Sequence, residues 1–252
     1  MAIPVKTPDE LARMRDSGRL AARVLAAVAR GVRPGTTTAE LDGIARDLIA
    51  SEGATSAFLG YRGFPGHICV SLNDEVVHGI PGDRRVEMGD IVSLDCGVLF
   101  RGWHGDTART VVVGATDPEA MRLVRVTEDA LAAAMAVAVE GNRLGDVSHA
   151  VQSVVEAAGF SVVREFVGHG IGRALHEDPQ IPNFGTAGKG PRLRAGMTLA
   201  IEPMVNQRGH EVRVDRDGWT VRTRDGGLSA HVEHTVAVGE GSAEVLTRAD
   251  GF

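Results

Sequence analysis

Apolar residues recur with helical spacing in two stretches near the start of the chain. Thr7 and Glu10 have the spacing of a capping box, and apolar residues three or four apart follow them, so we predict a helix to about Arg30. The threonines at 36–38 cap a second amphipathic stretch, which ends at Gly53. The first half of the chain is therefore predicted to begin with two helices.

Shorter apolar runs after these helices predict strands. Two short strands are expected over 68–72 and 75–78. A longer pair follows: one apolar run begins at Gly89 and continues to residue 100, Arg101-Gly102 favours a turn, and a β-branched run returns over 107–113. This pattern predicts a hairpin of two mostly apolar strands.

The same order of elements starts again after residue 116. Helices are predicted over 118–139 and 146–158, and strand-like segments follow. Glycines enclose the second helix of each half at the same spacing of 18 residues, Gly35 with Gly53 and Gly141 with Gly159. We interpret residues 1–252 as a single α+β domain with two related halves, roughly 7–116 and 117–240.

Each half also places carboxylates on apolar strands. Asp95 ends one run and Asp106 precedes another, while Glu202 and Glu233 hold the corresponding places in the second half. A buried unpaired carboxylate is very costly, so carboxylates that converge need a cation between them, or one of them must stay protonated. Taken singly, Asp106 could be a turn residue, Glu202 an N-cap before Pro203, and Glu233 an ion-pair partner. Their repeat-related positions favour one shared site.

One histidine joins this set. His169 lies between Gly168 and Gly170, which let the backbone come close to a ligand. Four carboxylates and one imidazole suit Mn, Fe, Co or Zn better than thiophilic metals. Five ligands are more than one cation needs, so the pattern favours two divalent ions about 3.5–4 Å apart.

Charge, hydrophobic runs and cysteine count argue against a nucleic-acid-binding, membrane-spanning or disulfide-rich protein. The net charge of -6 argues against direct binding of nucleic acid. The chain has no apolar run long enough for a membrane span, and residues 1–10 contain no signal core. Its two cysteines are too few for a disulfide framework and suit a reducing compartment. We expect a cytoplasmic protein without membrane contact, and a monomer.

Seven motifs then occur in order, and together they closely resemble type I methionine aminopeptidase, a family of metallopeptidases with the pita-bread fold. The resemblance spans about Thr7 to Val238. The lack of a long insert between His176 and Glu202, and of a zinc-finger or Pro-rich extension, is similar to the short bacterial subtype. The motifs are His78-Gly79-Ile80-Pro81, Asp95, His104-Gly105-Asp106-Thr107, Gly168-His169-Gly170-Ile171-Gly172, His176-Glu177, Ile201-Glu202-Pro203-Met204 and His231-Val232-Glu233-His234-Thr235.

The resemblance implies a fold of two pseudo-symmetric halves with an antiparallel sheet flanked by helices. It also implies roles for the five ligands. Asp106 and Glu233 would bridge two divalent cations. Asp95 would bind one cation, and His169 with Glu202 would bind the other.

Catalytic and substrate-binding residues are implied in the same way. Glu202 would move the proton, His176 would hydrogen-bond the oxygen of the tetrahedral intermediate, and His78 would face the scissile amide nitrogen. The other histidines are interpreted as structural or solvated. Among them, His104 is the strongest candidate for a further role. The substrate's methionine side chain would enter an apolar pocket, with His78 on its rim. The pocket positions are Tyr61, Phe64, Cys69, Leu175 and Trp219, with Leu175 where the family more often has Phe.

The implied function is removal of the initiator methionine from nascent proteins whose second residue is small, with transient association with the ribosome. A proline-specific peptidase of the same fold is the nearest enzymatic alternative, although such enzymes usually carry an additional N-terminal domain. A binding protein that kept the fold would have lost ligands, and all five are present. A calcium-binding protein is a weaker alternative because no D-x-D-x-D-G loop occurs. The chain begins Met1-Ala2-Ile3, so its own N-terminus is predicted to be a substrate.

Overall fold

The computed structural model describes residues 3–115 and 117–248. The prediction that Met1 is removed before Ala2 therefore lies outside the described residues. None of the helices within the described ranges is long and apolar enough to cross a membrane.

The predicted helices form, and their first turns explain their positions. Thr7 caps the first helix, and its capping box with Glu10 is complete, as the sequence predicts. The fourth helix begins two residues earlier than predicted because the Asp146 carboxylate accepts a hydrogen bond of 2.7 Å from the N–H of Arg143. The helices are α1 Pro8–Gly31, α2 Thr38–Ser51, α3 Pro118–Val137 and α4 Leu144–Ala157, with a 3₁₀ turn η1 at Tyr61–Gly63.

The hairpin that carries Asp95 and Asp106 is longer than the sequence pattern predicts. Strand β4 covers Ile91–Phe100, and β5 covers Trp103–Val112, starting four residues before the predicted return. Asp106 therefore lies inside β5, opposite Gly97 of β4. The added pairing comes from Trp103, which is 1% exposed and anchors the start of the strand in the core.

The hairpin forms the centre of a sheet to which both halves of the chain contribute. The sheet order is β1-β4-β5-β14-β9-β7-β8, with β2 paired to β4 and β15 paired to β14, and every pairing is antiparallel. Two three-stranded sheets, β13-β10-β6 and β11-β12-β3, lie beside it. The remaining strands are β1 Thr55–Ser56, β2 Cys69–Leu72, β3 Glu75–Val77, β6 Ser161–Val162, β7 Val167–Gly170, β8 Glu177–Pro182, β9 Thr198–Ile201, β10 Met204–Asn206, β11 Val212–Val214, β12 Val221–Thr223, β13 Ser229–His231, β14 Glu233–Ala237 and β15 Glu244–Val245.

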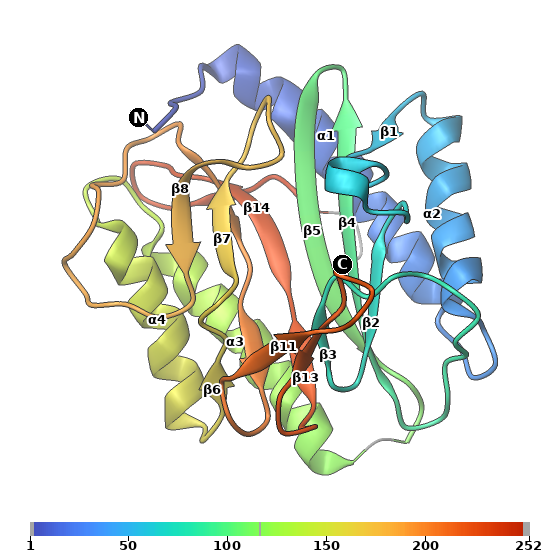
Figure 1. Ribbon diagram of the computed structural model, residues 1–252. Coiled ribbons are helices and arrows are strands. Elements are labelled where there is room, and N and C mark those ends of the chain that lie inside the picture. Colours follow the sequence, from blue (N-terminus) through green and yellow to red (C-terminus); the bar gives the residue numbers. More distant parts are fainter. Residues whose placement is uncertain (1–2, 116, 249–252) are drawn as a thin grey trace.

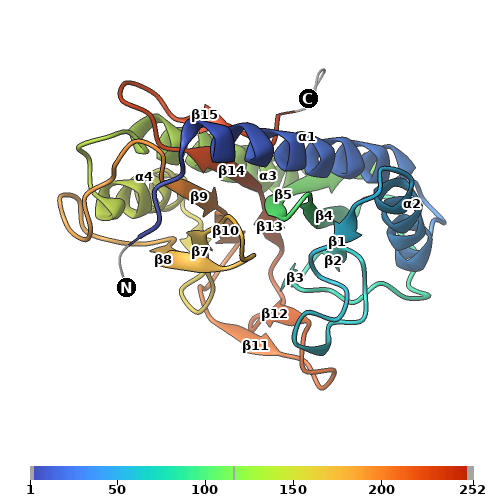
Figure 2. The same ribbon diagram turned by 90° about the horizontal axis from the view of Figure 1, so that it is seen from above.

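The helices cover one face of the large sheet, and strands β3, β11 and β12 lie on the other side of the molecule (Figures 1 and 2). One apolar cluster packs α1 and α2 against β2 and β4, and another packs α3 and α4 against β9 and β14. The two halves of the chain meet where β5 pairs with β14. Their interpretation as related halves of a single domain stays a prediction.

Helix α1 packs closely against the β4-β5 hairpin at two glycines. A Cβ placed on Gly105 of β5 would lie 2.7 Å from both the Cα and the N of Gly18 in α1, and a Cβ on Gly18 would lie 2.5 Å from the carbonyl oxygen of Leu246. Only residues without a side chain permit this approach. The backbone next to Asp106 is thus fixed by helix packing.

Replacing Gly105 with alanine should destabilise the fold. Overpacking against backbone atoms costs about 1–3 kcal/mol, and a chain of this size loses about 2–4 °C of Tm per kcal/mol. Gly43→Ala is the matched control, because the nearest atom to its Cβ is Nη2 of Arg46 at 3.9 Å and alanine favours a helix interior. Calorimetric Tm values for both variants test this; an unchanged Tm for Gly105→Ala would contradict the packing argument.

Candidate metal centre

A cavity of about 390 Å³ brings together the five ligands predicted from the sequence. Each comes from a different strand or strand end of the large sheet. They are Asp95 from β4, Asp106 from β5, His169 from β7, Glu202 directly after β9, and Glu233 at the start of β14.

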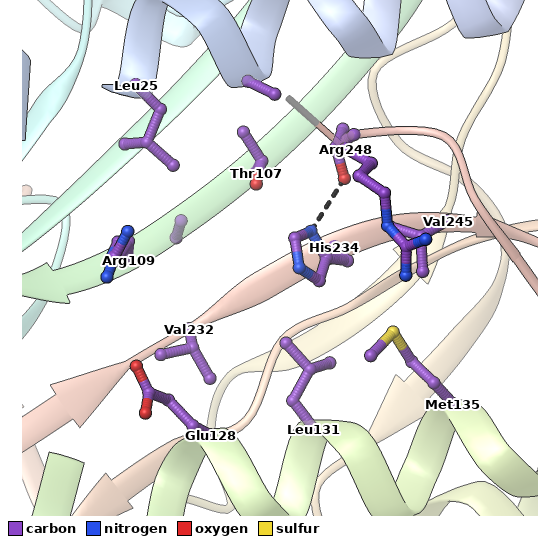
Figure 3. A pocket seen from close by; sticks show the side chains of 13 residues that line it. Leu25, Thr107, Arg109, Glu128, Leu131, Met135, Val232, His234, Val245 and Arg248 are labelled. Carbon is purple, nitrogen blue, oxygen red and sulfur yellow. Dashed lines mark hydrogen bonds between the residues drawn. The ribbon is translucent and has the colours of Figure 1, made fainter. Parts of the chain in front are cut away.

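Strand alternation explains why the acids of the central strands share one face. Neighbouring residues of a strand point to opposite faces, so Thr107 and His234, which follow Asp106 and Glu233, point the other way. Thr107 and His234 pair in register and line a separate cavity of about 330 Å³ between α1 and α3. Figure 3 shows this second cavity, and the dashed line in it starts at His234. Nδ1 of His234 lies 2.9 Å from the hydroxyl of Thr247.

The ligand atoms have the separation that a shared cation requires. Nε2 of His169 is 4.0 Å from Oδ2 of Asp106 and 3.6 Å from Oε1 of Glu202. Ligand atoms of Asp106, His169 and Glu233 all lie within 4.8 Å of one another. These distances are too long for hydrogen bonds, but they suit donors that each approach one ion at about 2.0–2.2 Å.

Asp106 and Glu233 are buried, Asp95 and Glu202 are half-buried, and several of their oxygens lack partners. Oδ1 of Asp95, Oδ1 of Asp106 and Oε1 of Glu233 have no hydrogen-bond partner among the described atoms. Burial raises the pKa of Asp106 to about 7. Burial also raises the pKa of Asp95, Glu202 and Glu233 well above their ordinary values, and repulsion from neighbouring carboxylates adds to the shift of these three. This donor set therefore fits a divalent cation, which would satisfy these oxygens.

His169 has the tautomer of a metal ligand. Its Nδ1 lies 2.9 Å from the carbonyl oxygen of Gly170 and donates to it, so the lone pair of Nε2 faces the carboxylates. Burial, and then repulsion from His176, lowers the pKa of His169 to about 3. The ring is therefore neutral at physiological pH, which is the form that binds metals.

The predicted substrate pocket forms the other end of the same cavity. Phe64 and Trp219 meet edge to face, with ring centroids 5.2 Å apart. Phe64, Cys69 and Leu175 are each at most 5% exposed. Tyr61, Phe64, Cys69, Leu175 and Trp219 all line the cavity, as do four residues that no motif indicated, Phe58, Arg62, Phe166 and Gln180.

The two predicted catalytic histidines lie between the carboxylates and the apolar pocket. The ring of His176 is 4.2 Å from that of His169, and its Nδ1 is 2.9 Å from the hydroxyl of Tyr61. His78 has a φ of 60° and contacts Phe166 edge to face at 5.5 Å. Burial, and then repulsion from His176, lowers the pKa of His78 to about 4. Both rings line the cavity.

The sequence assigned no role to His231, yet the structure places it beside the site. Nε2 of His231 lies 3.5 Å from Oε2 of Glu202, and the residue is 2% exposed. Burial, and then His78, lowers the pKa of its ring to about 3. The signal available in the sequence was its position two residues before Glu233 on an apolar run. Other histidines have different partners, such as Asp42 for His67 and the Gly172 carbonyl for His104.

Comparison with known proteins places this geometry in a family. Residues 12–240 match the family model of metallopeptidase family M24. The chain is 51% identical over 245 residues to a protein named methionine aminopeptidase from Clostridium perfringens (strain 13 / Type A), covering 97% of this chain and 98% of the relative. It is 50% identical over 243 residues to methionine aminopeptidase 1 of Bacillus subtilis (strain 168), covering 96% and 98%.

A solved structure extends the similarity to three dimensions. The crystal structure of methionine aminopeptidase from Thermotoga maritima superposes with a TM-score of 0.96 at 47% identity, and the match covers 98% of this chain and 100% of that one. This agreement confirms the predicted α+β class and pita-bread fold.

The buried carboxylates should make the metal-stripped protein less stable as pH rises from about 6.5 to about 8.5. In the folded state the pKa of Asp106 is raised to about 7, so the folded chain keeps protons that the unfolded chain has lost, and stability falls with rising pH. Histidines whose pKa is lowered in the folded state make the stability rise with pH, but only below about pH 6.5, where the unfolded histidine still binds a proton. Melting curves after chelation test this.

The control for this prediction is Asp106→Asn. It removes one raised group, so the fall in Tm across the same pH range should be smaller than in the parent chain. Adding Mn²⁺ to the parent should also reduce the fall. A Tm of the stripped parent that rises across this range would contradict the assignment of raised pKa values to the carboxylates.

Proposed function

Because the chain belongs to metallopeptidase family M24, we propose that this cavity is the active site of a methionyl aminopeptidase, which removes methionine from protein N-termini. One observation carries the proposal. A cluster of buried carboxylates with His169 and an apolar pocket closed by Trp219 share a single cavity, so a hydrolytic centre adjoins a side-chain pocket. The substrate is the free N-terminus of a polypeptide.

The site holds two divalent cations in this proposal, drawn from Mn, Fe, Co or Zn. When bound, such ions polarise a carbonyl and make water acidic enough to act as a nucleophile at neutral pH. Asp106 and Glu233 would be shared by the two ions, Asp95 would hold one of them, and His169 with Glu202 would hold the other.

The side chains around the ions move protons and stabilise charge. Glu202 would take the proton of the attacking water and give it to the leaving nitrogen, because its carboxylate lines the cavity beside His169. His176 donates from Nε2 to the developing oxyanion while the Tyr61 hydroxyl donates to its Nδ1. His78 faces the scissile amide nitrogen.

The apolar end of the cavity selects methionine. Phe64, Cys69 and Trp219 surround an unbranched thioether, and Leu175 gives the pocket a smaller wall than an aromatic ring would. The α-amine of the substrate would be held at the Asp95 end of the site, which would restrict cleavage to a free N-terminus. A small second residue is required because a bulky side chain collides with the wall next to the ions.

The cellular setting follows from the substrate. The protein acts in the cytoplasm on nascent chains, associates transiently with the ribosome, and works as a monomer without binding nucleic acid or membrane. The net charge of -6 supports the absence of direct nucleic-acid binding.

The substrate prediction is tested with three peptides. Metal-loaded protein should release methionine from Met-Ala-Ser much faster than it cleaves Ala-Pro or a Leu-Ala-Ser peptide, because only the unbranched side chain fills the pocket without strain. Assays in metal-free, Mn, Fe, Co and Zn forms identify the active ion. Preferential cleavage of Ala-Pro would overturn the proposal in favour of a proline-specific peptidase.

The role of His176 is tested by His176→Ala. Losing one oxyanion donor should lower kcat about 10²–10³-fold while the bound metal stays unchanged, because the ring acts on the transition state. His149→Ala is the control, since His149 is exposed on α4 and contacts Ser153. Loss of metal from His176→Ala would make this residue a ligand and contradict the assigned role.

A further inference from the structure

The Glu202 carboxylate lies between two imidazole rings. Its Oε1 is 3.6 Å from Nε2 of His169, and its Oε2 is 3.5 Å from Nε2 of His231. The two oxygens therefore face different neighbours. The Oε1 side belongs to the metal centre, and the Oε2 side faces β13.

The backbone of His231 is held by a buried hydroxyl. Oγ1 of Thr110 accepts from the N–H of His231 at 3.0 Å and donates to its carbonyl oxygen at 2.8 Å. Since Thr110 has a single hydroxyl proton, Ser93, whose Oγ lies 2.8 Å away, must donate to it. A hydrogen-bonded chain thus runs from β4 through β5 to β13 and holds the backbone that carries the ring.

The nitrogen that faces Glu202 has no other partner. Nε2 of His231 is buried and makes no hydrogen bond among the described atoms. Leaving such a buried group without a hydrogen bond is unfavourable, so a partner is expected nearby. A turn of the Glu202 side chain by less than about 1 Å brings Oε2 into hydrogen-bond range of this nitrogen.

We propose that His231 is a positioning residue for Glu202: its Nε2–H donates to Oε2 and holds the carboxylate with Oε1 toward the metal centre. The inference rests on the proposed function. His231 is not among the described residues that line the cavity, so it acts through Glu202 and does not touch the substrate. A carboxylate held at one oxygen keeps the lone pairs of the other directed at its ion.

Two substitutions separate this role from packing. His231→Gln keeps an N–H donor at about the same distance from the backbone, whereas His231→Leu keeps similar bulk without a donor. Loss of an outer hydrogen bond to a ligand typically costs about 10–100-fold in metal affinity or activity. We expect His231→Leu to bind Mn²⁺ about 10–100-fold more weakly at unchanged stoichiometry and to lose kcat on Met-Ala-Ser with little change in KM, and His231→Gln to recover most of both.

Mn²⁺ affinity is measured by calorimetry on the metal-stripped full chain, with His234→Leu as the matched control. His234 lies next to Glu233 but lines the cavity on the other face, so its replacement should change Tm and leave Mn²⁺ affinity within about twofold. The proposal is overturned if His231→Leu keeps the Mn²⁺ affinity and kcat of the parent. It is also overturned if His231→Gln and His231→Leu lose affinity and kcat equally, or if His231→Leu binds one ion fewer than the parent. If the parent binds Mn²⁺ but does not cleave Met-Ala-Ser, the proposed function fails, and the calorimetry still decides the role of His231.

Discussion

The constraint on which the site depends is the cost of burying several carboxylates close together. Asp95, Asp106, Glu202 and Glu233 line one cavity, and burial raises the pKa of each, with repulsion from neighbouring carboxylates adding to the shift at Asp95, Glu202 and Glu233. Such a cluster is unstable at neutral pH unless cations or protons neutralise it. The rest of the fold must therefore supply enough packing energy to hold these groups together, which explains the dense apolar clusters on the opposite face of the sheet.

The fold meets this constraint by building the site on rigid strands. The acids of β4, β5 and β14 are carried by a continuous antiparallel ladder, and α1 fixes the hairpin backbone through Gly18 and Gly105. Strand alternation sends Thr107 and His234 to the other face, so the acids face the cavity together. Ligands on packed strands hold their geometry better than ligands on loops.

The sequence predicted those parts of the molecule that depend on local periodicity. The capping box of Thr7, the helices and the apolar runs before Asp95 and Glu202 are local signals, and they were found. The start of β5 was misplaced because Trp103 is fixed by packing against distant residues. Phe166 and His231 were missed as parts of the site for the same reason, since only the pairing of distant strands brings them to the cavity or to Glu202.

The arrangement also links substrate selection to catalysis. Tyr61 lines the apolar pocket and hydrogen-bonds His176, while His78 contacts Phe166 and Trp219 at the pocket wall. Under the proposed function, a side chain that fills the pocket would press on Tyr61, Phe166 and Trp219, which contact the two histidines. Binding energy from a methionine side chain would then contribute to the transition state, so a poorly fitting side chain would lower kcat as well as raise KM. In the proposed function, selectivity would therefore depend on the same contacts that position His78 and His176.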